Sequence, residues 1–207
     1  MTSSKPVANG DVLEIFESPE RTLRARILDV ATELFAAKGY AGTSVREVAE
    51  AAGCTKPALY YHFANKEGLF RAAVTSAHAT FERVEALARD AGTVRERLLR
   101  SFEAVAEIVE RHPSHMRLLF RAENHAQLGQ PLVDMEPLRA KHFGLVRALV
   151  EAGVATGEIR PDVDIEDATL ALVGMVHFQL QAFLEGRPFQ RDFGERLVRL
   201  FMEGVRG

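Results

Sequence analysis

Residues 53–63, GCTKPALYYHF, bring a lysine, two tyrosines and a histidine into one short segment. Lysine supplies positive charge for phosphate groups, while tyrosine and histidine supply hydrogen bonds and flat faces for thymine methyl groups. Leu59 and Phe63 are four positions apart, so on a helix they face the core together. Because successive helical residues turn by about 100°, Lys56 and the tyrosine pair cannot all join them. The spacing favours an outward surface that could enter a DNA groove; the alternative is that the tyrosines only cover a domain junction.

No other group of residues points to catalysis or to a metal. The chain has no G-x-S-x-G, H-E-x-x-H or phosphate-loop motif, the patterns of nucleophilic, zinc and nucleotide chemistry. His112 and His115 have H-x-x-H spacing, but Pro113 interrupts the helix that would align them. We therefore predict no enzyme, no metal site and no cofactor, with an enzyme of unknown type as the weakest alternative. Cys54 is interpreted as a small packed residue, and a redox switch is its alternative.

Four helices must position the segment. Residues 21–40 have apolar side chains at helical spacing up to a glycine stop, and residues 44–53 open with the capping-box pattern S-x-x-E and also end at glycine. The third helix has Thr55 as its N-cap and Pro57 in its first turn, and a longer fourth helix follows the N-cap Asn65. Two short helices joined by a tight turn and braced by longer ones form a helix-turn-helix.

The net charge of −3 argues weakly against a nucleic-acid partner, but the distribution of the charges along the chain favours one. Residues 1–20 carry one basic and four acidic groups, and we expect them to be a flexible tail. Residues 21–71 carry eight basic and five acidic groups, whereas the remaining 136 residues carry 17 basic and 20 acidic groups. A positive segment between two negative ones is the asymmetry expected of a local DNA-binding surface.

The second half of the chain is also expected to be helical. Its five expected helices lie at roughly 94–111, 114–127, 132–155, 165–186 and 189–205. The fourth of these is apolar nearly all round, so it must be buried all round, and we expect one face to meet a second subunit. The candidate interface residues are Leu170, Val173, Leu180 and Leu184.

Nothing in the sequence indicates a membrane or secreted protein. The longest apolar run, residues 168–176, is far shorter than the ~18–20 residues that span a bilayer. The N-terminus has no apolar segment after a basic start, and a single cysteine excludes an internal disulfide. We expect a cytoplasmic protein.

Apolar and polar side chains dispersed over the second half could line a small-molecule pocket. The candidates are His115, Met116, Phe120, Phe143, Met175, His177, Phe178, Gln179 and Phe183. An ordinary core is the alternative for each of them. Segment 175–183 is the first candidate, because its polar residues in a buried-looking helix need partners, either a ligand or the opposing subunit.

Residues 39–70, GYAGTSVREVAEAAGCTKPALYYHFANKEGLF, closely resemble the DNA-binding signature of the tetracycline-repressor (TetR) family. The resemblance runs from about Arg24 to Val74 and includes the pattern L-Y-x-H-F-x-x-K-E-x-L from Leu59 to Leu69. The rest of the chain resembles the family's second domain in length and helix pattern only. The resemblance implies an all-α fold with an N-terminal helix-turn-helix domain of three helices, at residues 21–80, and a C-terminal helical ligand-binding and dimerisation domain, at residues 81–207.

The resemblance also implies roles for single residues. Tyr60, His62 and Lys66 match positions that contact phosphates, as does Ser44 at the start of the second helix. Lys56, Tyr61 and Arg46 match positions that can reach base edges. The sequence departs from the family at CTKP, where Pro57 stands in place of the usual glycine.

The function implied is that of a homodimeric transcriptional regulator, a repressor that leaves its palindromic operator when a small, largely apolar effector binds. Two recognition helices must then lie about one DNA turn apart, ~34 Å or somewhat more. An effector that binds better to a dimer with another spacing of these helices must lower the affinity for DNA, because the two binding equilibria are coupled. The alternative is a helical ligand-binding or interaction protein that no longer reads DNA.

Overall fold

The computed structural model describes residues 19–124 and 129–205, and within these ranges it contains ten helices and no strand. Most of the expected tail, residues 1–18, lies outside the described residues. The helices are α1 (Pro19–Gly42), α2 (Val45–Ala51), α3 (Lys56–His62), α4 (Lys66–Ala79), α5 (Glu82–Arg89), α6 (Val94–Arg111), α7 (Pro113–Asn124), α8 (Glu136–Thr156), α9 (Ile165–Leu184) and α10 (Phe193–Val205). The all-α fold with a helix-turn-helix is confirmed.

The three predicted N-caps of the helix-turn-helix region are confirmed. Ser44, Thr55 and Asn65 each accept a hydrogen bond from the backbone N–H three residues later, at 3.1, 3.3 and 2.7 Å. Each bond satisfies a donor that the first helical turn leaves unpaired. The capping partner Glu47 also forms an ion pair with Lys38, which joins α2 to α1.

The start and end of α2 are tied to α1. The predicted stop at Gly39 is a kink with φ 74°, after which α1 continues to Gly42. The buried Thr43 hydroxyl donates to the Gly39 carbonyl at 2.9 Å, and Arg26 Nε donates to the Ala52 carbonyl at 2.8 Å. These bonds fix α2 and the turn after it on α1, which α2 needs because so short a helix is marginal alone.

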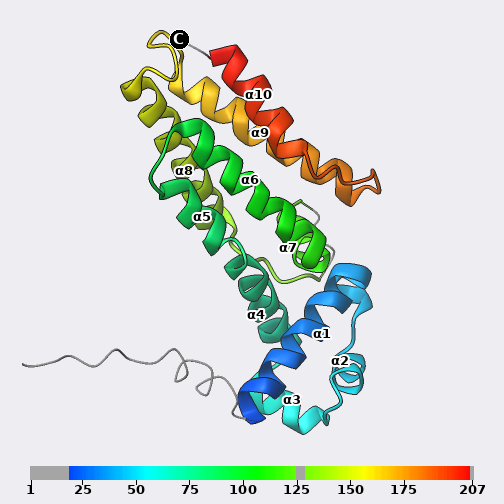
Figure 1. The fold of residues 1–207 in the computed structure, drawn as a ribbon. Helices are drawn as coiled ribbons and strands as arrows, with labels where there is room; N and C mark the ends of the chain where they lie inside the picture. The colour runs from blue at the N-terminus through cyan, green and yellow to red at the C-terminus, as the bar shows by residue number, and fades with distance from the viewer. Residues whose placement is uncertain (1–18, 125–128, 206–207) are drawn as a thin grey trace, which may run out of the picture.

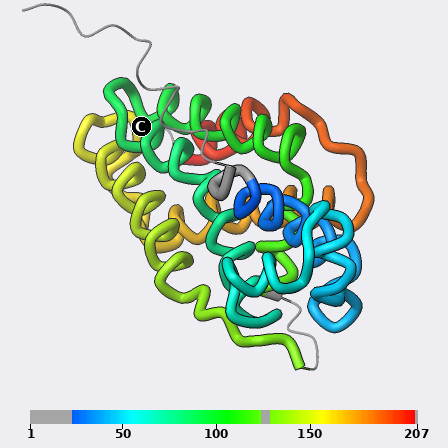
Figure 2. The backbone as a smooth tube through the Cα atoms, turned by 90° about the horizontal axis from the view of Figure 1, so that it is seen from below, coloured from blue at the N-terminus to red at the C-terminus, as the bar shows by residue number. Residues whose placement is uncertain are grey.

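The helices form an elongated molecule, with α3 at one end and α10 at the other (Figure 1). Helix α1 packs on α4 and α7, and α4 also packs on α7, so these three helices join the two halves of the chain. In the second half α5 packs on α6 and α8, α6 on α10, and α8 on α9. In the view from below, the N-terminal helices in blue and cyan overlie this second bundle (Figure 2).

Three helices differ from the sequence-based expectation. Helix α5 was not expected, because half of its eight residues are charged and one of these, Glu85, is buried. Helix α8 begins at Glu136 rather than near residue 132, with Pro137 in its first turn, where its missing N–H has no cost. Helix α10 begins at Phe193 rather than near residue 189.

Helix α9 is less buried than its composition suggests. Its first turns are in the core at Ala168, Thr169 and Leu172, whereas Leu170 is 54% exposed and Phe178 is 72% exposed. By length and composition alone, α9 could cross a membrane, and it is the one helix of the described residues of which this holds. In aqueous solution, this exposed apolar face therefore needs another surface to cover it.

Candidate nucleic-acid interface and cavity

Helix α3 presents the surface expected from its sequence. Leu59 and Phe63 are buried, while Tyr60 is 46% exposed, Tyr61 is 76% exposed and Lys56 is exposed. Because α3 lies at the end of the molecule (Figure 1), the tyrosines do not cover a junction between the two halves of one chain. The resulting face combines one cation with two phenol groups, which suits phosphate and base contacts.

Two further predicted contact residues lie at the end of α3 and at the N-cap of α2. His62 is half-buried, and the Tyr61 ring meets it edge-on at 5.1 Å between ring centroids. Ser44 is exposed; its oxygen already accepts the capping bond of α2, but its hydroxyl hydrogen can still be donated to a phosphate.

Arg46 on α2 is exposed but already has a partner. Its Nε donates to Glu50 Oε1 at 2.7 Å, and this hydrogen bond, with the carboxylate charge, raises the pKa of Arg46. Such an exposed i,i+4 ion pair contributes little to stability, because water screens it. Breaking the ion pair therefore costs little, so Arg46 can leave Glu50 and bind a base or a phosphate.

Lys66 is held differently from the other cations. Its Nζ lies 4.3 Å from the centroid of the Tyr40 ring, a cation–π contact, and burial lowers the pKa of Lys66. Tyr40 in turn packs edge-on against Phe70 at 5.2 Å. The Lys66 ammonium therefore helps to hold the start of α4 against α1, in addition to the phosphate contact that the family resemblance implies.

A cavity of about 250 Å³ lies among α4 to α9. Its wall is largely apolar, with members such as Phe81, Leu98, Phe102, Leu119, Leu138, Leu145 and Leu172. Its polar members are His78, Glu123, Arg139, His142 and His177. An apolar wall with a few polar groups is the usual form of a small-molecule site.

The structure brings three of the nine predicted pocket residues to this cavity, Met116, Phe120 and His177. The rings of Phe120 and His177 stack with centroids 4.8 Å apart. The other six, His115, Phe143, Met175, Phe178, Gln179 and Phe183, are not among its lining residues. Conversely, the polar residues contributed by α4 and α8 were not predicted, because they are far from segment 175–183 in sequence.

Three residues of α9 lie on a different face of the helix from the one that we expected. Val173 and Leu180, predicted for the dimer interface, line the cavity, whereas Phe178, predicted for the pocket, points outward. Leu170 is exposed as an interface residue should be, and Leu184 is half-buried beside α1 and α7 in a surface hollow. With about 100° per residue, positions 170, 174 and 178 share the face that points away from Leu172.

His115 lies on α7 outside the cavity lining. Its ring stacks on His112 at 5.1 Å, and its Nδ1 is buried without a hydrogen-bond partner among the described residues. Burial, followed by the neighbouring His112, lowers the pKa of His115. The two imidazole planes are nearly parallel, at 11° to each other.

Both halves of the chain match known protein families. Residues 27–73 match the family described as bacterial regulatory proteins, tetR family. Residues 88–201 match the tetracyclin repressor-like C-terminal domain. The first match covers the helix-turn-helix, and the second covers most of the cavity wall.

Full-length relatives agree with these matches. The transcriptional repressor NicS of Pseudomonas putida is 28% identical over 78% of this chain and 77% of its own length. The probable transcriptional regulator ArpR of the same species is 30% identical, over 74% of this chain and 76% of its own length. The crystal structure of the TetR-family regulator PfmR from Thermus thermophilus superimposes with a TM-score of 0.73 at 27% identity, covering 88% of this chain and all of PfmR. The chain belongs to the TetR family of DNA-binding transcriptional regulators, which are not enzymes.

Proposed function

We propose that the protein is a cytoplasmic repressor that binds a palindromic operator as a homodimer and leaves it when a small, largely apolar effector enters the cavity. The observation that carries the proposal is the exposed Lys56–Tyr60–Tyr61 face of α3, at one end of the molecule (Figure 1). The proposed division is residues 21–80 for DNA binding and 81–207 for effector binding and dimerisation. Both family matches fall inside these limits.

The proposed DNA contacts divide into two classes. Ser44, Tyr60, His62 and Lys66 contact phosphates, which fixes the position of the protein on the duplex but carries no sequence information. Arg46, Lys56 and Tyr61 reach base edges in the major groove, where donors and acceptors differ between base pairs. The exposure of Lys56 and Tyr61 supports their part in this division.

The proposed dimer uses the outward face of α9 together with α8. Leu170, Gly174 and Phe178 share this face, and the glycine between two large apolar residues lets another backbone approach closely. Glu166 and Asp167 in the first turn, and exposed Gln179, make this helix a poor membrane span despite its length. A second copy of the same face is the covering surface that a symmetric dimer supplies.

The proposed effector response passes through α4 and α7. His78 of α4 and Met116 of α7 line the cavity, and both helices pack on α1. An effector that binds one arrangement of these helices better than another shifts the population toward it, and DNA affinity falls by the same coupling free energy. The apolar wall supports an effector with an apolar body and one or two polar groups.

The direct test is fluorescence anisotropy with a labelled DNA fragment from upstream of the protein's own gene. We expect saturable, sequence-specific binding that Lys56→Ala weakens; Lys56 is exposed and has no hydrogen bond or ion pair with the described residues, so its loss should not disturb the fold. A matched control is Arg199→Ala, which removes an exposed cation from α10, at the other end of the molecule from α3 (Figure 1). A folded dimer that binds this DNA no better than random DNA would favour the alternative, a ligand-binding protein that no longer reads DNA.

A further inference from the structure

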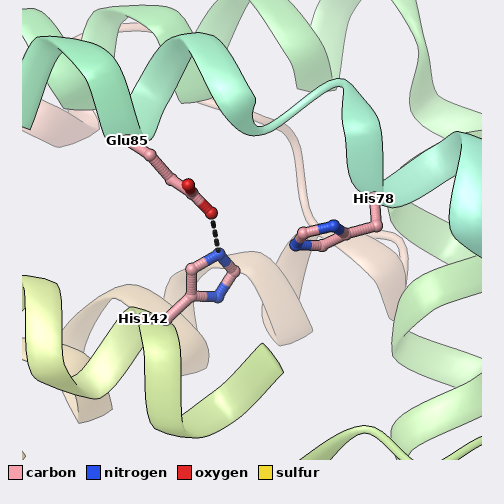
Figure 3. Close-up of side chains that lie close together, drawn as sticks. All are labelled: His78, Glu85 and His142. Atoms are coloured by element: carbon pink, nitrogen blue, oxygen red, sulfur yellow. Dashed lines mark ion pairs between the residues drawn. The ribbon is translucent and has the colours of Figure 1, made fainter. Parts of the chain in front are cut away.

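Three side chains from three helices meet at one edge of the cavity. His78 lies in the last turn of α4, Glu85 lies on α5 and His142 lies on α8, and Figure 3 shows the three pointing toward one another. One potential ligand atom from each lies within 4.8 Å of the other two. Glu85 Oε1 and His142 Nε2 are 3.7 Å apart, and the two histidine rings have centroids 5.7 Å apart. The cluster has the donor set His₂Glu that holds zinc in open sites.

Two atoms of this cluster are buried and unsatisfied. His78 Nε2 and Glu85 Oε1 have no hydrogen-bond partner among the described residues, and Glu85 is only 4% exposed. A buried polar atom without a partner costs about 1–3 kcal/mol. Both atoms point into the space between the three side chains (Figure 3), so one cation there would satisfy both.

The other carboxylate oxygen of Glu85 is already used. Lys141 Nζ lies 2.7 Å from Glu85 Oε2, and Arg89 lies 3.9 Å from the same oxygen. Lys141 is itself exposed, so its ammonium can remain on Oε2 in contact with water. Oε1 is thereby left free for a second cation, and the carboxylate would bridge the lysine and the metal.

Burial is the first cause that lowers the pKa of both His78 and His142. At His142 the neighbouring His78 is the next cause; Lys141 also lowers the pKa of both histidines, Glu85 opposes these effects in both, and Glu82 opposes them at His78. The direction favours neutral imidazole, which is the form that coordinates a metal.

We propose that His78, Glu85 and His142 form a binding site for Zn²⁺ at the edge of the cavity. Tetrahedral zinc with bonds of about 2.0–2.1 Å needs ligand atoms about 3.3 Å apart. The separations of up to 4.8 Å must therefore shorten by about 1.5 Å at most. Side-chain rotations within the cluster must supply this movement, and the His142 side chain, which is 40% exposed, has room to rotate.

The fourth coordination position would face the cavity, since His78 and His142 belong to its lining. Water, or an oxygen of a bound molecule, would complete the tetrahedron there. Sequence alone predicted no metal site, because the three residues are 7 and 57 positions apart and follow no metal-binding spacing. Zinc binding does not depend on the DNA-binding function proposed above.

The test is a titration of the metal-free, full-length protein with Zn²⁺ against a chelating indicator dye, repeated with Co²⁺ while recording its visible d–d absorption. We expect one Zn²⁺ per chain, and a Co²⁺ spectrum of low-coordinate, nitrogen- and oxygen-ligated metal. His142→Gln and Glu85→Gln should each weaken zinc binding by at least about tenfold. His142→Gln is the safer of the two for folding, because this side chain is 40% exposed.

The matched control is the stacked pair His112 and His115, which also holds two imidazoles but has no carboxylate in a three-ligand cluster. His112→Gln should leave zinc affinity unchanged, and circular dichroism should show that every variant is folded. The proposal is overturned if the wild type shows no saturable binding. It is equally overturned if His142→Gln and Glu85→Gln bind zinc as well as the wild type, or if His112→Gln alone removes the binding.

Discussion

A charge placed on the outward face of α9 should break the dimer without unfolding the chain. Phe178 is 72% exposed in the monomer, so Phe178→Glu removes little packing within one subunit. In a symmetric interface the residue occurs twice, and burial of each phenylalanine contributes about 1.5–3 kcal/mol. The two together amount to about 3–6 kcal/mol, which weakens dimerisation by a factor of about 10² to 10⁴.

The measurement is sedimentation velocity over a series of protein concentrations. Wild-type protein should remain dimeric where Phe178→Glu is monomeric, and the variant should lose specific DNA binding at the same concentrations. Tyr61→Glu is the matched control for sedimentation: it makes the same kind of change at an exposed aromatic residue on α3 and should remain dimeric, although it should also lose DNA binding. A Phe178→Glu protein that stays dimeric at every concentration refutes the placement of the interface on this face.

Three smaller changes examine other parts of the structure. Arg46→Ala should lower discrimination between operator variants more than it lowers affinity for random DNA; an equal loss on all sequences in a binding titration would make Arg46 a phosphate contact. Glu158→Ala should lower the free energy of unfolding in urea by about 1–2 kcal/mol, because its carboxylate accepts from Val94 N at 3.0 Å and so caps α6. His115→Leu should flatten the pH dependence of stability below about pH 6.5: the lowered pKa of buried His115 means that the unfolded state binds more protons, so the wild type loses stability as pH falls from 6.5. A wild type and variant with the same slope in urea titrations between about pH 5 and 7 would exclude that role.

The helix-turn-helix could be predicted closely because its signals are local. The caps Ser44, Thr55 and Asn65 lie within four residues of the donors that they satisfy. Leu59 and Phe63 follow the helical repeat, and both are buried as predicted. Each of these features depends on short stretches of sequence, where composition and spacing determine the conformation.

The second half was harder to predict, because its important contacts join distant parts of the chain. The sequence did not indicate that Glu85 is buried, because charged residues are rarely buried. Its charge is paired with Lys141, which comes from another helix. On α9 the composition was correctly interpreted as apolar on every side, but composition does not indicate which side faces α8, the cavity or solvent. For this reason Val173, expected at the interface, lines the cavity, and Phe178, expected in the pocket, is exposed.

Helix α4 connects the two surfaces that the proposed mechanism must couple. Its first residue, Lys66, packs on Tyr40 of α1 beside the helix-turn-helix, and His78 in its last turn lines the cavity. At 1.5 Å per residue these two positions are about 18 Å apart along a continuous helix. In the proposed mechanism, a displacement of His78 by an effector moves the Lys66 end as well, since α4 has no kink-forming proline. Helix α3, which directly precedes that end in the chain, would then change position with what occupies the cavity.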